Sequence, residues 1–447
     1  MSGGTEANAT ALMPSSTRRL PLATRGEGVW IWDENGKDYL DGSSGPVAVN
    51  LGECHPDVVA ALAEQAATLS FAHRLQFRNE PVERLARDVV SLLGEDFDRA
   101  MFVSSGSEAN ELALKLAFMY WDAQGLPEKT RFVTTTNSYH GSTLASIQIS
   151  GQPRYSAAFR PLVTENERVR APYLHRIRID ESIADPAPIV LQRLREDFAG
   201  LDHERTAAIL IESVGGASAA ALVPPPGYFE LLRELCDEYR MLWIADEVMA
   251  GFGRTGSWFG FQHWAAVPDL VVFAKGVSGG YAPLGGVGLS RRVSRALLEA
   301  KGAVSAGHTY SNNPLGAAVG VATIEVMRRD GLVAAADARG EALGEGLRRI
   351  AERSGSIVDV RGIGLMWGVE FGDAATGRPF PPSAEFTPRF VESCTAEGLL
   401  VYPARGGIDG VNGDAVLISP PLIISESEIA ELLGRFERAL RRLETEA

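Results

Sequence analysis

The chain of 447 residues predicts an α/β fold, with a mostly parallel sheet covered by helices on both faces. Short apolar or β-branched runs alternate with helical patterns between roughly residues 100 and 290, as in chains whose helices connect parallel strands. The chain is too long for one compact core, which indicates more than one domain. Its hydrophobic fraction of 45% and charged fraction of 22% are ordinary for a globular protein, so disorder is not expected.

The elements follow one another in an order that suggests how the domains are built. GVWIWDENGKDYLDG, near the N-terminus, predicts a strand, an Asn-Gly turn and a second strand. Strands are then expected at AMFVSS, RFVTTT, AAILIE, MLWIAD and DLVVFAK, and helices at EANELALKLAFMYW and GYFELLRELCDEYR. A long helical pattern, LVAAADARGEALGEGLRRIAERSG, and short strands around IVDVRGIGLMWGVEF come last. This order predicts a large domain of residues 61–324 and a smaller domain from both chain ends, residues 1–60 and 325–447.

Composition excludes several classes of partner. The formal net charge of −14 argues against nucleic acid, whose phosphates are bound by dense Lys and Arg. No apolar run approaches the about 18 residues that span a membrane, and the N-terminus lacks the features of a secretory signal. We therefore expect a cytoplasmic protein with no membrane or nucleic-acid partner. The cysteines, Cys54, Cys236 and Cys394, are far apart and odd in number, so each is expected to be a buried thiol rather than a disulfide or metal ligand.

Polar side chains follow three of the predicted strands at their carboxyl ends, where open parallel sheets bind their ligands. The first is SSGSEANE, in which Ser105 and Glu108 match the S-x-x-E capping box of a helix start. The amides and dipole of a helix start, with Gly106 allowing close approach, are a suitable seat for phosphate. An ordinary helix cap is the structural alternative.

The other two strand ends carry Asp246 and Lys275. Burial lowers the pKa of a lysine, and its neutral amine can then attack a carbonyl to form a Schiff base. The two residues lie 275 − 246 = 29 positions apart, about one strand-to-strand excursion in such a sheet. A phosphate seat, a buried lysine and a buried acid are together the parts that hold pyridoxal phosphate, although any lysine taken singly is more often a solvated side chain.

Several motifs, in one order, resemble those of the class III pyridoxal phosphate-dependent aminotransferases from about Gly28 to the C-terminus: SSGSEANELALKLA, YHGST, LLRELCDEYRMLWIADEVMAGFGRTG, PDLVVFAKGVSGGYAPLGG, VRGIGLMWGVEF and SPPLII. The resemblance implies fold type I, with a mostly parallel seven-stranded sheet in the large domain and an α+β smaller domain. It also implies a homodimer with shared active sites. The activity implied is a ping-pong transfer of an amino group from an amino-acid or amine donor to a ketone or aldehyde acceptor.

The resemblance also assigns roles to residues. Lys275 would form the Schiff base with the cofactor and move the proton of the substrate, and Asp246 would pair with the pyridine nitrogen. Arg254 and Arg361 are expected to form structural salt bridges. The other implied contacts surround the cofactor: Val248 and Tyr139 on the two ring faces, His140 beside Tyr139, Glu212 near the ring, Ser105, Gly106 and Ser107 at the phosphate, and Thr309 at the phosphate of the partner subunit's cofactor.

Departures from the family pattern bear on the substrate. Val47 stands where amine-specific members often have tryptophan, and the smaller valine would open the pocket. Arg405 is a candidate for binding the donor's carboxylate, or it is simply a surface arginine. Ala217 stands where members acting on ornithine or γ-aminobutyrate carry a second glutamate, which speaks against those substrates. Ser213 replaces the usual proline, and Met249 replaces a glutamine near the cofactor's phenolic oxygen.

Other activities on the same fold stay open. TYSNNPLGAAVG and DEVM also resemble glutamate-1-semialdehyde aminomutase, but Thr143 stands where that enzyme typically has an aspartate, and the complete GFGRTG favours an aminotransferase. A dialkylglycine-type decarboxylase is less favoured, and a scaffold that binds cofactor without catalysis does not explain an intact Lys275 and Asp246. The sequence does not identify the donor or the acceptor.

Overall fold

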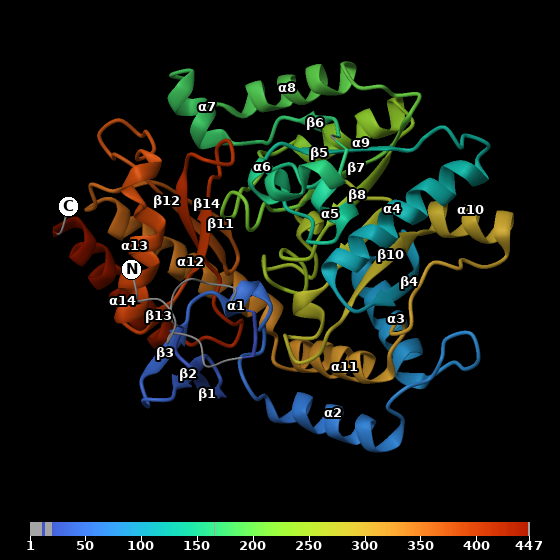
Figure 1. Cartoon of the computed structure of the whole chain (residues 1–447), viewed down its shortest axis with the longest axis horizontal. Coiled ribbons are helices and arrows are strands. Elements are labelled where there is room, and N and C mark those ends of the chain that lie inside the picture. The colour runs from blue at the N-terminus through green and yellow to red at the C-terminus, as the bar shows by residue number, and fades with distance from the viewer. Residues whose placement is uncertain (1–10, 14–19, 165, 446–447) are drawn as a thin grey trace.

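A seven-stranded sheet forms the centre of the protein, whose computed structural model describes residues 11–13, 20–164 and 166–445 (Figure 1). The strand order is β4-β10-β9-β8-β7-β5-β6, and only β10 runs antiparallel to its neighbours. This confirms the predicted α/β class and the mostly parallel sheet. The strands are β4 (Phe97–Val103), β5 (Arg131–Thr135), β6 (Arg168–Val169), β7 (Thr206–Glu212), β8 (Leu242–Asp246), β9 (Leu270–Phe273) and β10 (Gly285–Ser290).

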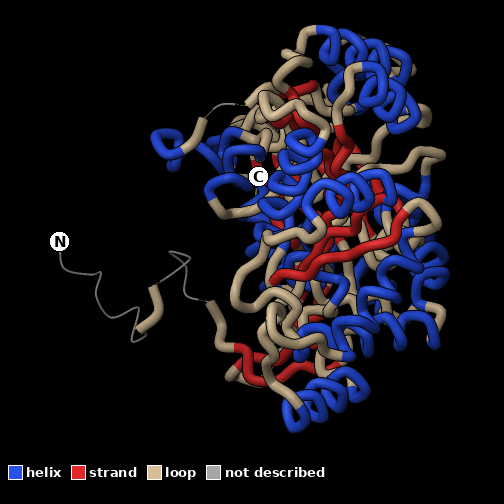
Figure 2. The backbone as a smooth tube through the Cα atoms, turned by 90° about the vertical axis from the view of Figure 1, so that its right-hand side faces the viewer, coloured by secondary structure: helices blue, strands red, loops and turns tan. Residues whose placement is uncertain are grey.

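The central strands are apolar throughout because helices cover both faces of the sheet. In β8, Leu242 and Ile244 pack with α4 (Gly106–Ala123), whereas Trp243 packs on the opposite face with α9 (Tyr228–Glu238). Successive side chains of a strand point to opposite faces, so a strand buried on both faces needs a continuous apolar run. Figure 2 shows strands running through the interior, with helices over the outside.

Other helices complete the layers and the flanks of the sheet. Among the described residues, no helix has the length and apolar character needed to cross a membrane. The remaining α-helices are α1 (Ser44–Val47), α2 (Pro56–Thr68), α3 (Glu80–Leu93), α5 (Leu144–Ile149), α6 (Pro153–Ser156), α7 (Leu174–Asp180), α8 (Ala187–Ala199), α10 (Arg291–Lys301), α11 (Pro314–Arg329), α12 (Leu332–Ala351), α13 (Phe386–Ala396) and α14 (Glu426–Thr445), with 3-10 turns η1 (Ala157–Leu162), η2 (Gly260–His263), η3 (Lys275–Val277) and η4 (Pro382–Ala384).

Two smaller sheets lie at the left of Figure 1, and one of them joins the N-terminal and C-terminal parts of the chain. One has the order β1-β2-β3-β13, in which β13, from the C-terminal part, pairs parallel with β3. The predicted hairpin is present, with Gly36 of its turn at a φ of +77°. The domain boundaries after residues 60 and 324 stay a prediction. The strands of these sheets are β1 (Ala23–Glu27), β2 (Trp30–Asp33), β3 (Asp38–Asp41) and β13 (Leu399–Leu400), then β11 (Ile357–Ile363), β12 (Met366–Phe371), β14 (Tyr402–Arg405) and β15 (Asp414–Ile418).

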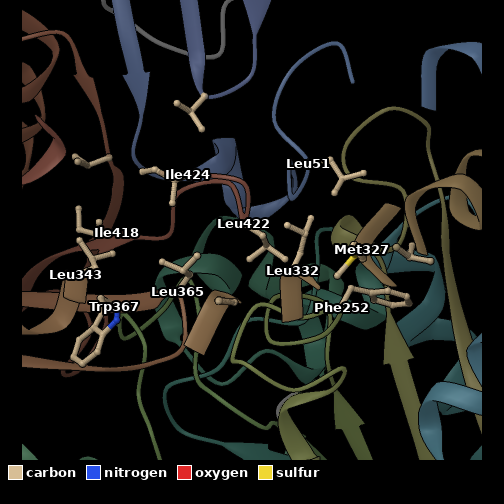
Figure 3. Close-up of a cluster of buried hydrophobic side chains, with 14 of the residues drawn as sticks. Leu51, Phe252, Met327, Leu332, Leu343, Leu365, Trp367, Ile418, Leu422 and Ile424 are labelled. Atoms are coloured by element: carbon tan, nitrogen blue, oxygen red, sulfur yellow. The ribbon is translucent and has the colours of Figure 1, made fainter. Parts of the chain in front are cut away.

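One hydrophobic cluster joins the N-terminal, central and C-terminal parts of the chain. Figure 3 shows Leu51, Phe252 and Leu332 in the same cluster as Trp367 and Ile418. The side chains come from positions far apart in the sequence, so the cluster can form only when these parts meet. Burial of this apolar surface is the main force that holds the chain ends against the large sheet.

Arg254 is buried beside this cluster, and its partners correct one expectation. Its Nη1 donates to the carbonyls of Leu365 (3.0 Å) and Pro420 (2.6 Å), and its Nη2 donates to Ser44 Oγ (3.2 Å) and Asn50 Oδ1 (2.9 Å). The predicted salt bridge is wrong, because neutral oxygens hold the guanidinium. Burial accordingly lowers the pKa of Arg254 to about 9, although Asp41 opposes the shift.

Arg361 forms the predicted structural ion pairs. Its Nη1 lies 2.6 Å from an Asp359 oxygen and 2.7 Å from Glu370 Oε2. Glu370 also pairs with Arg176 and accepts from the Tyr173 hydroxyl at 2.7 Å. Burial alone would raise the pKa of Glu370, but the two arginines outweigh burial and lower it to about 2. The buried network joins α7 to the sheet of β11 and β12.

The cysteines differ in burial. Cys236 and Cys394 are buried, as expected, but Cys54 is exposed. Cys54 lies in a turn before α2 with a φ of +56°, so its backbone follows the turn rather than the core. The expectation of burial was wrong for Cys54 because an isolated small apolar residue carries no periodic signal.

Candidate active site

The carboxyl ends of neighbouring parallel strands bring the charged residues of the candidate site together. Glu212 ends β7, Asp246 ends β8, and Lys275 follows β9 by one intervening residue. Glu212 and Asp246 are direct partners in the β7–β8 register. Because parallel strands end at the same edge of a sheet, residues distant in the sequence meet there.

A cavity of about 150 Å³ lies at this edge. That volume is enough for one six-membered aromatic ring. Eight of the predicted site residues line it, and so do three that were not assigned to the site: Gly106, Ser107, Tyr139, His140, Glu212, Asp246, Val248 and Lys275, with Asn110, Gly141 and Met249.

Asp246 is buried and has a donor on each carboxylate oxygen. Its Oδ2 lies 2.7 Å from His140 Nδ1 and accepts from Asn110 Nδ2 at 3.0 Å. Its Oδ1 accepts from the backbone N–H of Val248 at 3.0 Å. An ionised carboxylate can only accept, which assigns the donated proton to Nδ1 of His140. The other ring nitrogen, Nε2, lies 2.9 Å from Thr134 Oγ1, so the imidazole is held from both sides.

Lys275 has an unusual backbone and an unusual environment. Its φ of +49° lies in the left-handed region, which a non-glycine residue rarely adopts and which is common at functional sites. Burial lowers the pKa of Lys275 to about 8, although Asp246 and Glu212 favour the charged form. The amine is therefore partly neutral near physiological pH and can act as a nucleophile.

Glu212 is held by backbone donors. Its Oε1 accepts from Gly216 N at 2.9 Å and its Oε2 from Tyr139 N at 3.2 Å. Burial raises the pKa of Glu212 to about 7; Asp246 adds to the rise, and His140 and the two amides oppose it. The side chain therefore fixes the backbone of Tyr139 against the end of β7.

Glu247 follows Asp246 but turns away from the cavity. Its Oε1 accepts from Ser213 Oγ at 2.5 Å and Phe261 N at 2.7 Å, and its Oε2 accepts from Gly260 N at 2.7 Å. Burial raises the pKa of Glu247 to about 7. Of the two consecutive acids, one faces the cavity and the other fixes the glycine-rich segment beside it.

The start of α4 forms one side of the cavity. Ser105 Oγ accepts from Glu108 N at 3.2 Å, while the Glu108 carboxylate accepts from Ser104 N at 2.8 Å. Half of the predicted capping box is present, because the glutamate reaches one residue further back than expected. A Cβ on Gly106 would lie 3.1 Å from Val248, so glycine lets the two segments approach. The first amides of a helix have no partner within it, which leaves them available for an anion.

Aromatic side chains extend from the cavity towards α6. The Tyr139 ring packs against Tyr155, with 4.5 Å between centroids and 52° between ring planes. Burial, and then the charge of Asp246, raise the pKa of Tyr139, so its hydroxyl stays protonated near neutral pH. Tyr139 and Tyr402 both border the cluster of buried apolar side chains that contains Met249.

Four predicted site residues lie outside the cavity lining. Ser105 is the cap of α4, and Thr309 is exposed. Val47 is buried in the same apolar cluster as Met249. Arg405 ends β14, where Ala404 belongs to that cluster; alternation along the strand therefore points Arg405 to the other face.

Asn110 is the polar residue of the cavity that sequence reasoning missed. It lies in SEANE, a segment whose sequence predicts a helix start and a phosphate seat but no contact with Asp246. The available signal was its position three residues after Ser107, which places both on one face of α4. Gly141 and Met249 also line the cavity, although the sequence did not predict that either would do so.

Known proteins are similar to this chain over nearly its whole length. The family model described as aminotransferase class-III matches residues 12–440. The chain is 36% identical over 440 residues to the uncharacterized aminotransferase YodT of Bacillus subtilis, covering 97% of this chain and 98% of that protein. It is similar to an (S)-enantioselective omega-transaminase from Thermomicrobium roseum, with a TM-score of 0.89, 33% identity and coverage of 97% and 96%. It is also similar to an amine transaminase from an uncultivated Pseudomonas species in its PLP-bound internal aldimine form. That comparison gives a TM-score of 0.89 and 31% identity, and it covers 97% of this chain and 98% of that chain.

Proposed function

Because the chain belongs to the class III aminotransferases, we propose that it transfers an amino group between a small-molecule donor and a carbonyl acceptor in the cavity beside Lys275. Enzymes of this class depend on pyridoxal phosphate. The observation that carries the assignment of the site is that Lys275, Asp246 and the start of α4 line one cavity. The aminomutase alternative is not favoured, since the relatives compared above are aminotransferases.

The residues present fit the cofactor. The amides at the start of α4 suit its phosphate, and the cavity volume suits its ring. Val248 and Tyr139 would lie against the ring, and Asp246 would face the pyridine nitrogen. Asn110, which holds Asp246 through Nδ2, lines the same cavity, and its Oδ1 is a buried acceptor with no hydrogen-bond partner among the described residues.

The chemistry divides between cofactor and protein. When bound, pyridoxal phosphate supplies an aldehyde that captures the amino group and a ring that accepts electrons from the substrate carbon. Lys275 would hold the cofactor covalently through Nζ and, once released, take the proton from the substrate carbon. Its lowered pKa suits that task, because a base acts best when its pKa lies near the working pH. Asp246 would keep the pyridine nitrogen protonated, and His140 and Asn110 hold Asp246 in place.

The working unit is proposed to be a homodimer in the cytoplasm. Apolar side chains are exposed in the loop between α2 and α3 and beside Thr309: Phe71 at 41%, Leu75 at 69%, Phe77 at 67% and Tyr310 at 61%. Phe71 and Tyr310 contact each other edge to face, with 6.2 Å between ring centroids. An exposed apolar patch of this kind favours a protein contact, and a second copy would bring Thr309 to its partner's cofactor phosphate.

The substrate roles of Val47 and Arg405 remain proposals. Val47 would widen the pocket because it lies in the same apolar cluster as Met249 and is smaller than a tryptophan. Arg405 would need to turn from the outer face of β14 to reach a carboxylate. Because Ala217 replaces the second glutamate of members that act on ornithine or γ-aminobutyrate, it supports a different substrate.

Absorption spectroscopy tests the proposed function. The purified protein with pyridoxal phosphate is expected to show a visible band that bleaches on addition of particular donors among alanine, glutamate and simple amines. Lys275→Ala is expected to bind the cofactor noncovalently and to lose turnover, while Lys115→Ala, at an exposed position on α4, should behave as wild type. No band with added cofactor, or appreciable turnover by Lys275→Ala, would overturn the assignment.

A further inference from the structure

We infer that Asn110 is a positioning residue that directs one particular oxygen of Asp246, Oδ1, towards the cofactor; the inference rests on the proposed function. Asn110 lies on α4 and is buried, with 1% of its surface exposed. Its Nδ2 donates to Asp246 Oδ2 at 3.0 Å and to the carbonyl of His140 at 2.7 Å. One amide group thus joins α4, the loop after β5 and the end of β8.

The two contacts fix the orientation of the Asn110 amide. Both partners, Asp246 Oδ2 and the His140 carbonyl, are acceptors. A flipped amide would place its oxygen against two other oxygens and lose both hydrogen bonds. The donor therefore faces Asp246, and Oδ1 of Asn110 is left without a hydrogen-bond partner among the described residues.

A count of lone pairs then distinguishes the two oxygens of Asp246. Each carboxylate oxygen offers about two acceptor sites. Oδ2 receives two donors, Asn110 Nδ2 and His140 Nδ1, so its sites are filled. Oδ1 receives the Val248 N–H and no second donor among the described residues, which leaves one site free. Because Asn110 and His140 together fill Oδ2, Oδ1 is the oxygen that can still accept the N–H of a protonated pyridine.

The helix that carries Asn110 gives the contact a second consequence. α4 begins at Gly106, so the proposed phosphate seat and the amide that holds Asp246 belong to one rigid helix. The separation between these two anchors is therefore set by helix geometry rather than by a flexible loop. A cofactor held at its phosphate would meet an Asp246 already oriented for its pyridine nitrogen.

The test compares Asn110→Leu, which keeps similar size without a donor, with Asn110→Asp and the control Ser393→Ala. Ser393 is also buried, but its hydroxyl donates to the carbonyl of Ala439 at 2.9 Å, between α13 and α14 and away from the cavity. The measurements are cofactor affinity of the apo-protein, the pH titration of cofactor absorbance, kcat, KM and Tm. Asn110→Leu is expected to lower kcat roughly 10- to 100-fold, weaken cofactor binding and shift the absorbance titration, with little change in KM.

Asn110→Asp gives a signature that a purely structural role would not produce. Its new carboxyl lies beside Asp246 and can donate only when protonated, so its activity should approach wild type as the pH falls. Ser393→Ala should lower Tm and leave the absorbance titration unchanged. A wild-type titration and kcat in Asn110→Leu, or a loss in Asn110→Asp that is equal at every pH, would overturn the inference. A wild-type protein without cofactor absorbance or turnover would instead overturn the proposed function beneath it.

Discussion

The amine of Lys275 should titrate near pH 8 in the apo-protein. Burial in the cavity lowers its pKa from the ordinary 10.5 to about 8. At pH 7 a group with a pKa of about 8 is roughly one-tenth neutral, whereas at 10.5 it would be neutral in roughly one molecule in three thousand. The difference, roughly 300-fold in reactive amine, is the advantage that the cavity gives to a nucleophile at this position.

Trace acetylation with acetic anhydride measures this titration directly. Apo-protein is labelled briefly at a series of pH values, and mass spectrometry quantifies acetylated Lys275, with the labelling curve of the exposed Lys115 as the comparison titration. The labelling rate of Lys275 is expected to reach half its maximum at about pH 8. A midpoint near 10.5 would refute the reasoning, because burial would then have no effect on the amine.

The variant Asp246→Asn provides an internal check on the sign of the electrostatics. Asp246 favours the charged form of Lys275, so removing its charge should lower the pKa of Lys275 and move the labelling midpoint to lower pH. A midpoint that moves to higher pH would show that the carboxylate does not act on the amine as described.

Three further predictions follow from the buried carboxylates. Asp246→Asn should keep the wild-type far-UV circular dichroism spectrum and lose roughly 100-fold or more in kcat, and a near-normal kcat would remove its proposed role. Glu370→Gln should lower the free energy of unfolding by about 3 kcal/mol in urea at pH 7, unlike Glu345→Gln on the surface. Because the pKa of Glu370 is lowered from 4.5 to about 2, its stabilisation is complete above pH 4.5 and lost as the pH falls towards 2; an effect independent of pH would contradict this. Glu247→Ala should cost about 2 to 5 kcal/mol in the same urea assay, since Gly260 and Phe261 would keep buried N–H groups without partners, and an unchanged midpoint would show that water replaces the carboxylate.

The apolar strands of the large sheet could be predicted from the sequence, but β10 could not. GGVGLS has few residues that favour strands, and its glycines are explained only by packing. A Cβ on Gly285 would lie 2.7 Å from the carbonyl oxygen of Ser105, and one on Gly286 would lie 2.6 Å from that of Met101. The close approach of β4 requires these glycines, and a single sequence does not show which strand will lie alongside.

The residues of the candidate site also differ in how well the sequence predicts them. Lys275 and Asp246 could be predicted because an ionisable residue after an apolar strand needs a partner at the sheet edge. For Asn110 the sequence offers only its spacing from Ser107, which is a weak signal because a polar residue within a helix usually faces water and its burial depends on where β8 ends. The role predicted for Arg405 depends on which face of β14 carries its side chain, and the alternation of β14 places Ala404 rather than Arg405 in the apolar cluster that contains Met249.

The position of Arg254 limits when the protein can finish folding. Its guanidinium is bound by oxygens of Ser44 and Asn50, made early in synthesis, and by those of Leu365 and Pro420, made late. A chain still emerging from the ribosome holds the first pair without the second. Until Pro420 arrives, the arginine keeps its hydration, and the apolar surface around it stays open. A chain cut short before that point would carry the strands of the large sheet but would leave the apolar surface beside Arg254 exposed to water.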